Sequence, residues 1–248
     1  MFEIEHRDGH VMHVVHDAED VRDAVALAVE EGLDLSGARL DGAELSGLDF
    51  ERARLTGASL ERALLEGCNL EEADLSNATL VGASLRGANL EESDLSRADL
   101  SRAVLDGANL EEASLRGACL EGASLRRANL ERARLEGVRA AGASFARSNL
   151  ERCDLRGADL SRADLSGANL ERTELCDAKL VEARLVGANV ERADLRRADL
   201  TDADLHEANL ERCDVEGACL QGAQLVSANV EGLRGNPVTG PIRTGPYR

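Results

Sequence analysis

The chain has 248 residues, a formal net charge of −18, and 2% aromatic residues with no Trp. Because an ordinary globular domain of this length buries several large rings, a conventional core is excluded. The acidic balance disfavours nucleic-acid binding, which needs a basic stripe to neutralise phosphates. The longest apolar run, "AVALAV", is far shorter than the roughly 20 residues of a membrane span, and no signal peptide is recognised.

The N-terminal stretch "FEIEHRDGHVMHVV" predicts a β-hairpin, with Asp8-Gly9 as a two-residue turn between alternating strands. Four histidines crowd this hairpin together with Asp8, and they are His6, His10, His13 and His16. In the register of that turn, His6 and His13 face one side of the hairpin, and His10 and His16 face the other. Four ligands then do not converge, so the sequence predicts no metal site.

The next segment, "DAEDVRDAVALAVEEG", predicts a helix with Asp17 as its N-cap and Gly32 as its C-cap. Four apolar residues fall on one face, which can lie over the structure that follows. These residues are Val21, Ala24, Val25 and Ala28. Residues 1–32 are therefore expected to form an N-terminal cap.

From residue 33 to residue 233 the chain repeats every five residues. Positions divisible by five from Leu35 to Val230 are Leu with six exceptions, and a small residue, mostly Ala, lies two places earlier. Apolar residues two apart face the same way in extended chain, and the polar or Gly pair that follows is typical of a turn. Because a period of five fits neither a helix nor a heptad, each unit is one short side and one corner.

A second period, of twenty residues, sets the number of sides in each coil. Asn recurs at this spacing in runs such as "NLEEA" at Asn69 and "NLERA" at Asn129. Four sides therefore close one coil, and the stacked asparagines are expected to share amide hydrogen bonds. About ten coils, with strands roughly 4.8 Å apart, predict a rod on the order of 48 Å long. The predicted ladder consists of Asn69, Asn89, Asn109, Asn129, Asn149, Asn169, Asn189, Asn209 and Asn229.

Units such as "ADLSR" (98–102) and "GANLE" (167–171) resemble those of the pentapeptide repeat proteins. The resemblance covers about residues 33–233 and implies an all-β fold, a right-handed quadrilateral β-helix. It is a weaker guide to function. Some bacterial members imitate duplex DNA in shape and charge, bind DNA gyrase and protect it from quinolones or peptide toxins, whereas most have no assigned role. Gyrase-protecting members commonly pair through their C-terminal coils, which implies a homodimer.

The C-terminal segment 234–248 has three prolines and no periodicity, so it is expected to be a tail. It either folds across the last coil or leaves that coil to a second subunit. The six cysteines predict reduced thiols in a cytoplasm. The nearest inward pair on one face, Cys153 and Cys213, is three coils apart, about 14 Å, which exceeds disulfide reach.

No residue pattern predicts catalysis or a cofactor. The glycines occupy repeat corners and do not form a phosphate-binding loop after a strand, and the repeat itself accounts for the Ser and Asp content. A bore filled by Leu and Ala leaves no pocket. The protein is therefore not expected to be an enzyme.

Surface charge is the informative quantity that remains. A Glu follows each ladder Asn by two places, and in the later coils the next residue is Arg, which predicts a parallel cationic ladder. In the middle coils the next residue is a second Glu, which predicts an uncompensated acidic patch. The patch consists of Glu71, Glu72, Glu91, Glu92, Glu111, Glu112, Asp74 and Asp94.

Two interpretations of this patch compete. A solvated corner tolerates any charge, and acidic residues favour solubility. Alternatively, the patch meets a basic surface made for DNA, since duplex DNA of the rod's length carries about 28 charges and the repeat carries roughly half as many. This second interpretation predicts a non-catalytic DNA mimic that binds a type II topoisomerase, DNA gyrase or topoisomerase IV, and protects or inhibits it. The rival is a scaffolding rod with no DNA-site partner; ice binding is disfavoured because no outward Thr ladder exists.

Overall fold

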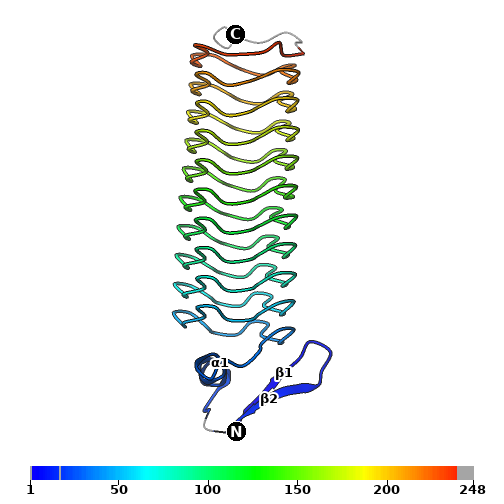
Figure 1. The fold of residues 1–248 in the computed structure, drawn as a ribbon, viewed down its shortest axis with the longest axis vertical. Coiled ribbons are helices and arrows are strands. Elements are labelled where there is room, and N and C mark those ends of the chain that lie inside the picture. Colours follow the sequence, from blue (N-terminus) through cyan, green and yellow to red (C-terminus); the bar gives the residue numbers. More distant parts are fainter. Residues whose placement is uncertain (1, 17, 239–248) are drawn as a thin grey trace.

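The computed structural model describes residues 2–16 and 18–238. A hairpin and a helix lie at one end of a tall stack of coils (Figure 1). Strands β1 (Phe2–Glu5) and β2 (Val11–Val15) form an antiparallel hairpin, and helix α1 (Val21–Glu30) follows. Within the described residues, no helix has the length and apolar character that a membrane crossing requires.

Residues twenty apart are neighbours along the stack. From Arg39–Ser59 to Asp214–Arg234, every parallel bridge joins residue i to residue i + 20, and the bridges recur every five residues along the chain. Each twenty-residue coil therefore has four sides, with one bridge on each. The right-handed sense and the number of about ten coils stay predictions.

The bore of the coils is filled by the Leu column and the small residues beside it, nearly all of them inaccessible to solvent. The few polar groups that point inward are hydrogen-bonded to backbone carbonyls, either of the coil before or, as for Ser93, three residues earlier in the same coil. Thr173 Oγ1 donates to Leu150 O at 2.8 Å, and Cys213 Sγ donates to Val190 O at 2.8 Å. Burial raises the pKa of the Cys213 thiol to about 12, so it stays protonated and unreactive. All six cysteines are free.

The corners need a residue in the left-handed backbone region. At a representative corner, the N–H of Ala108 donates to Leu105 O at 3.0 Å, and Gly107 between them has a φ of 70°. A positive φ at the third residue is the signature of a type II turn. Many corners place a larger residue there, such as Arg127 with a φ of 58°. Its N–H donates to Ala146 O of the next coil at 3.1 Å, so stacking holds the strained backbone in place.

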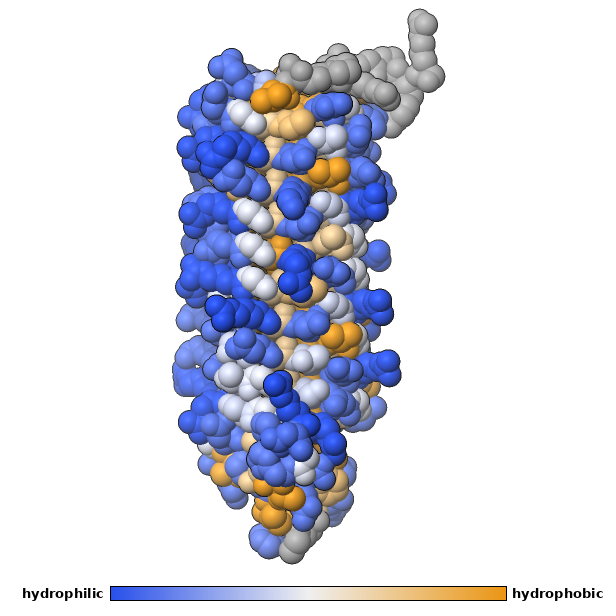
Figure 2. Space-filling model, turned by 90° about the vertical axis from the view of Figure 1, so that its right-hand side faces the viewer, coloured by the Kyte–Doolittle hydropathy of each residue, from blue (hydrophilic) through white to orange (hydrophobic). Residues whose placement is uncertain are grey.

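Hydrophilic side chains cover both edges of the face in Figure 2, and a narrow column of apolar residues runs between them. This arrangement follows from the five-residue unit, which places polar residues at the corners and points its apolar residues inward.

The N-terminal cap closes the first coil by adding a strand to its edge. His6 forms an antiparallel bridge with Ala38, and the N–H of Arg39 donates to Glu5 O at 2.8 Å. Arg22 of α1 donates to a coil carbonyl at 2.7 Å. These contacts pair backbone groups that an open sheet edge would leave unpaired.

Helix α1 differs from its prediction at both ends. Asp20 is the N-cap, and its carboxylate accepts from the N–H of Asp23 at 2.9 Å. The predicted cap, Asp17, lies outside the described residues. At the other end, Glu31 is the C-cap, and Gly32 follows it with a φ of 67°. The predicted C-cap was thus wrong by one residue, because the left-handed Gly comes after the cap in this motif.

The predicted apolar face of α1 is buried at Ala24, Val25 and Ala28 but not at Val21, which is 37% exposed. Val21 is the first helical residue, and helical side chains lean toward the N-terminus. Its side chain therefore extends past the edge of the buried face of α1.

The hairpin turn is one residue longer than predicted. The N–H of Gly9 donates to His6 O at 2.8 Å, and the N–H of His6 donates to His10 O at 2.8 Å. Arg7, Asp8 and Gly9 therefore form a three-residue turn, with Gly9 at a φ of 92°. Because a one-residue change of register moves side chains to the other face, His6 and His10 share one side of the hairpin. The prediction that they face opposite sides was wrong.

The corner geometry predicts a backbone penalty for Gly107→Ala. Apart from Gly107 and its two chain neighbours, no described residue has an atom within 4 Å of the added methyl group, so the left-handed φ alone opposes the change. We expect the free energy of unfolding, measured by urea denaturation, to fall by about 1 kcal/mol. Gln221→Ala, at an exposed turn position outside the positive-φ set, is the control and should change it by less than about 0.5 kcal/mol. Equal effects of the two substitutions would contradict the strain argument.

Candidate functional site

The nine asparagines form one continuous chain of side-chain hydrogen bonds, here called the Asn ladder (Asn69 to Asn229). From Asn89 onward, each Nδ2 donates to the Oδ1 of the Asn in the coil before, at 2.9–3.2 Å. Asn69 begins the ladder by donating to Asp49 at 2.9 Å. An amide can donate and accept at once, which a carboxylate cannot, so Asn suits every interior position.

In the middle coils, the ladder amides also bind the neighbouring glutamates. Asn109 Nδ2 donates to Glu91 Oε2 at 3.0 Å, and the coils on either side repeat this bond at 3.1 and 3.2 Å. The carboxylates are thereby oriented along one corner of the rod. Because the amide is neutral, their negative charge remains.

In the later coils, arginines form ion pairs with the glutamates of this corner. From Arg132 to Arg212, each Arg of the column forms an ion pair with the Glu that precedes it, at 3.3–3.7 Å. The arginines are exposed and the glutamates are half-buried, so each pair is accessible to solvent and contributes little to stability. Their main effect is to cancel the charge of this part of the corner.

The predicted acidic patch is compensated at both ends, which corrects the sequence analysis. Arg52 donates to both carboxylate oxygens of Glu72, at 2.9 and 2.8 Å, and this hydrogen bonding lowers the pKa of Glu72. Arg132 lies 3.3 Å from Glu112 and 3.6 Å from Glu111. These partners lie about twenty residues away in the chain, whereas the prediction of an uncompensated patch rested on the adjacent residue alone. Comparing positions at that spacing would have found them.

The centre of the patch has no ion pair. Among the described residues, no cation pairs with the acids in this set: Glu71, Glu91, Glu92, Asp74 and Asp94. Asp74 instead accepts from the hydroxyl of Thr56 at 2.7 Å. Glu92 and Asp94 are exposed, and Glu91 is half-buried. We call these three residues, Glu91, Glu92 and Asp94, the acidic centre.

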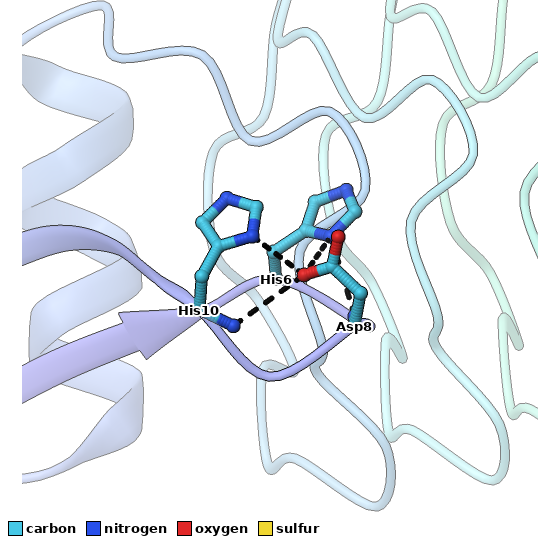
Figure 3. Close-up of side chains that lie close together, drawn as sticks. All are labelled: His6, Asp8 and His10. Atoms are coloured by element: carbon cyan, nitrogen blue, oxygen red, sulfur yellow. Dashed lines mark hydrogen bonds and ion pairs between the residues drawn. The ribbon is translucent and has the colours of Figure 1, made fainter.

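A separate cluster lies at the tip of the cap hairpin. Asp8 Oδ1 is 2.8 Å from His6 Nδ1 and 2.5 Å from His10 Nδ1, and the two rings stack with centroids 4.7 Å apart (Figure 3). Hydrogen bonding to His6 is the main cause that lowers the pKa of Asp8. His13 lies apart, with its Nε2 2.7 Å from a coil carbonyl, and His16 is exposed.

The hollows found on the described surface lie under the cap or between neighbouring corners. One of the latter is lined by Asp106, Arg126 and Arg127 with their neighbours. Such a hollow offers charged groups for binding.

The repeat matches the family model for pentapeptide repeats (8 copies) in overlapping segments at 34–71, 53–91, 93–132, 128–172, 158–197, 178–217 and 193–232. The chain therefore belongs to the pentapeptide repeat family, and its coils form a repeat β-solenoid. No curated protein matches the chain.

Several solved structures are similar to this chain. One is HetL, a pentapeptide repeat protein involved in heterocyst differentiation regulation from the cyanobacterium Nostoc sp. strain PCC 7120. It is 32% identical, with 87% of this chain and 94% of HetL covered and a TM-score of 0.58. A pentapeptide repeat protein of the Arabidopsis thaliana thylakoid lumen is 28% identical over 41% of this chain and 71% of its own, with a TM-score of 0.40. QnrB1, a plasmid-mediated fluoroquinolone resistance protein, is 24% identical over 77% and 90%, with a TM-score of 0.31.

The ladder geometry predicts that Asn149→Ala is costly. The change removes the ladder bonds to the coils before and after, both 3.1 Å, and the bond from the Glu151 N–H at 3.3 Å. We expect urea unfolding to show a loss of about 1–3 kcal/mol. Asn229→Ala is the control, because this exposed residue ends the ladder and makes one ladder bond, so its loss should be smaller. A larger loss for Asn229→Ala would argue against a cooperative ladder.

Proposed function

We propose that the protein is a non-catalytic binding protein that docks its acidic centre against the DNA-binding surface of a type II topoisomerase, DNA gyrase or topoisomerase IV. Docking would protect or inhibit that enzyme. The observation that carries the proposal is the charge pattern along one corner of the rod. Arginines pair with the glutamates in the later coils, whereas Glu91 and Glu92 have no cationic partner within the described part of the chain.

The rigidity of the rod supports the proposal. Backbone bridges hold successive coils about 4.8 Å apart, and Asn amides orient the carboxylates before any partner arrives. Pre-ordered groups lose little conformational entropy on binding. The charge density is lower than that of DNA, which has one charge per about 1.7 Å, so electrostatic steering is the expected contribution.

The docking surface in this proposal is smaller than the patch that the sequence predicts. Arg52 and Arg132 neutralise the outer glutamates. A basic partner would therefore be attracted most strongly to the coil that contains residues 91–94. The neighbouring Glu71 and Asp74 add negative charge on one side.

The proposal includes a homodimer joined through the C-terminal coils and acting in the cytoplasm. At that end of the described rod, Val230 is 47% exposed and Val238 is 65% exposed, which supports a covered apolar edge. The six free cysteines are compatible with a reducing compartment.

A scaffolding rod without a DNA-site partner is the second candidate. Two observations favour it: most of the Glu corner in the later coils is neutralised, and the chain is similar to HetL, which is involved in heterocyst differentiation regulation. In that case the ladders would serve stability, and the partner would recognise other surfaces.

Charge reversal at a matched pair of positions tests the proposal. Glu92 and Glu207 are both exposed, both at positive φ (54° and 58°), and neither has an ion pair among the described residues. We expect Glu92→Lys to weaken binding to purified DNA gyrase about ten-fold, mainly through slower association, and to flatten its salt dependence. Glu207→Lys changes the net charge equally and should leave the Kd within about two-fold. Fluorescence anisotropy measures both.

The two candidates predict different outcomes. Equal weakening by both variants would assign binding to total charge and not to the acidic centre. Absence of binding by the unmodified protein, with no effect on supercoiling in the presence or absence of a quinolone, would favour the scaffolding rod.

A further inference from the structure

The hairpin tip brings together three side chains of the kinds that bind metals. His6, Asp8 and His10 each offer one donor atom, and these atoms all lie within 4.8 Å of one another. The two histidines are opposite each other across the hairpin, and Asp8 belongs to the turn between them. Figure 3 shows both rings on one side of the turn, with the carboxylate reaching toward both.

The turn is fixed against the first coil, so the cluster is a built feature of the fold. The N–H of Arg7 donates to Gly37 O at 2.8 Å, and Arg7 Nη1 donates to Gly57 O at 3.2 Å. The His6 ring packs directly on Gly37, where an added Cβ would lie 2.1 Å from His6 Nε2. Nδ1 is therefore the His6 nitrogen that faces Asp8. A site on a rigid support loses less entropy on binding.

We propose that His6, Asp8 and His10 form a binding site for a divalent transition-metal ion, and that zinc is the ion that fits best. Two imidazole nitrogens and one carboxylate oxygen are a donor set that zinc accepts, with water or another group in the fourth position. Calcium and magnesium prefer all-oxygen sites, so this donor set disfavours them.

The metal requires small side-chain movements. Zinc–ligand distances of about 2.0–2.1 Å place tetrahedral donors roughly 3.4 Å apart. His6 is the anchored ligand, with 25% of its side chain exposed, whereas Asp8 and His10 are 60% and 63% exposed. Rotation of these two side chains brings all three donors onto one ion in place of the present hydrogen bonds.

The site would cross-link the two strand ends at the point where the cap contacts the coil. A bound ion would hold His6 and His10 together and oppose opening of the hairpin that covers the first coil. The exposed fourth position remains available to water or to a side chain of a partner. This role is independent of the acidic centre, which lies in the middle coils.

Isothermal titration of the full-length, tag-free chain with zinc chloride tests the proposal. We expect one zinc ion per chain, with the affinity lowered at least about ten-fold in His10→Ala and in Asp8→Asn. These exposed residues are chosen because His6→Ala would also remove packing on Gly37. His16→Ala is the control, since His16 is an exposed histidine directly after β2 without a described contact, and the zinc affinity of this variant should stay within about two-fold.

A second readout locates the ion. In NMR spectra, the ring protons of His6 and His10 should shift on zinc addition and those of His16 should not. The proposal is overturned if zinc binds the unmodified protein no more tightly than His10→Ala, or if His16→Ala weakens binding as much as His10→Ala does.

Discussion

The backbone hydrogen bonds between successive coils are the constraint on which the whole structure depends. On the Asn side of one coil, the N–H of Leu110 donates to Asn129 O at 2.6 Å, and the N–H of Asn129 donates to Ala108 O at 2.9 Å. The same pattern repeats on the other sides, so from Arg39 to Arg234 the bridged residues have fixed neighbours twenty positions away. A slip of one residue would turn the Leu column toward solvent, which the buried apolar surface strongly opposes.

Fixed stacking turns a repeated residue into a column, and the chemistry of each column follows from its composition. Stacked asparagines satisfy one another. Stacked glutamates repel, by roughly 0.9 kcal/mol for neighbours about 4.8 Å apart in water before screening by salt. The structure relieves this repulsion with Asn amides in the middle coils and with arginines in the later ones. The acidic centre is the part of the corner where a neutral donor replaces the cation, and this difference gives the rod a distinctive face.

The two ends of the stack differ from its middle, because the terminal coil at each end is an open sheet edge with no further coil to pair with. At the N-terminal end the hairpin provides one, through the pairing of His6 with Ala38. The three-residue turn of the same hairpin places His6 and His10 on one side. At the C-terminal end of the described residues, Arg234 and Val238 pair with the coil before and leave apolar side chains exposed.

The sequence by itself determined the repeat: the five-residue side, the four-sided coil, the Leu and Ala bore and the column of asparagines. It could do so because one local pattern occurs forty times without a frame slip, so each uncertain unit is corrected by its neighbours. Tertiary structure alone decided two other features, the length of the hairpin turn and Asp20 as the helix cap. Each occurs once and depends on small energy differences between local alternatives. Docking of the cap against the first coil selects among them.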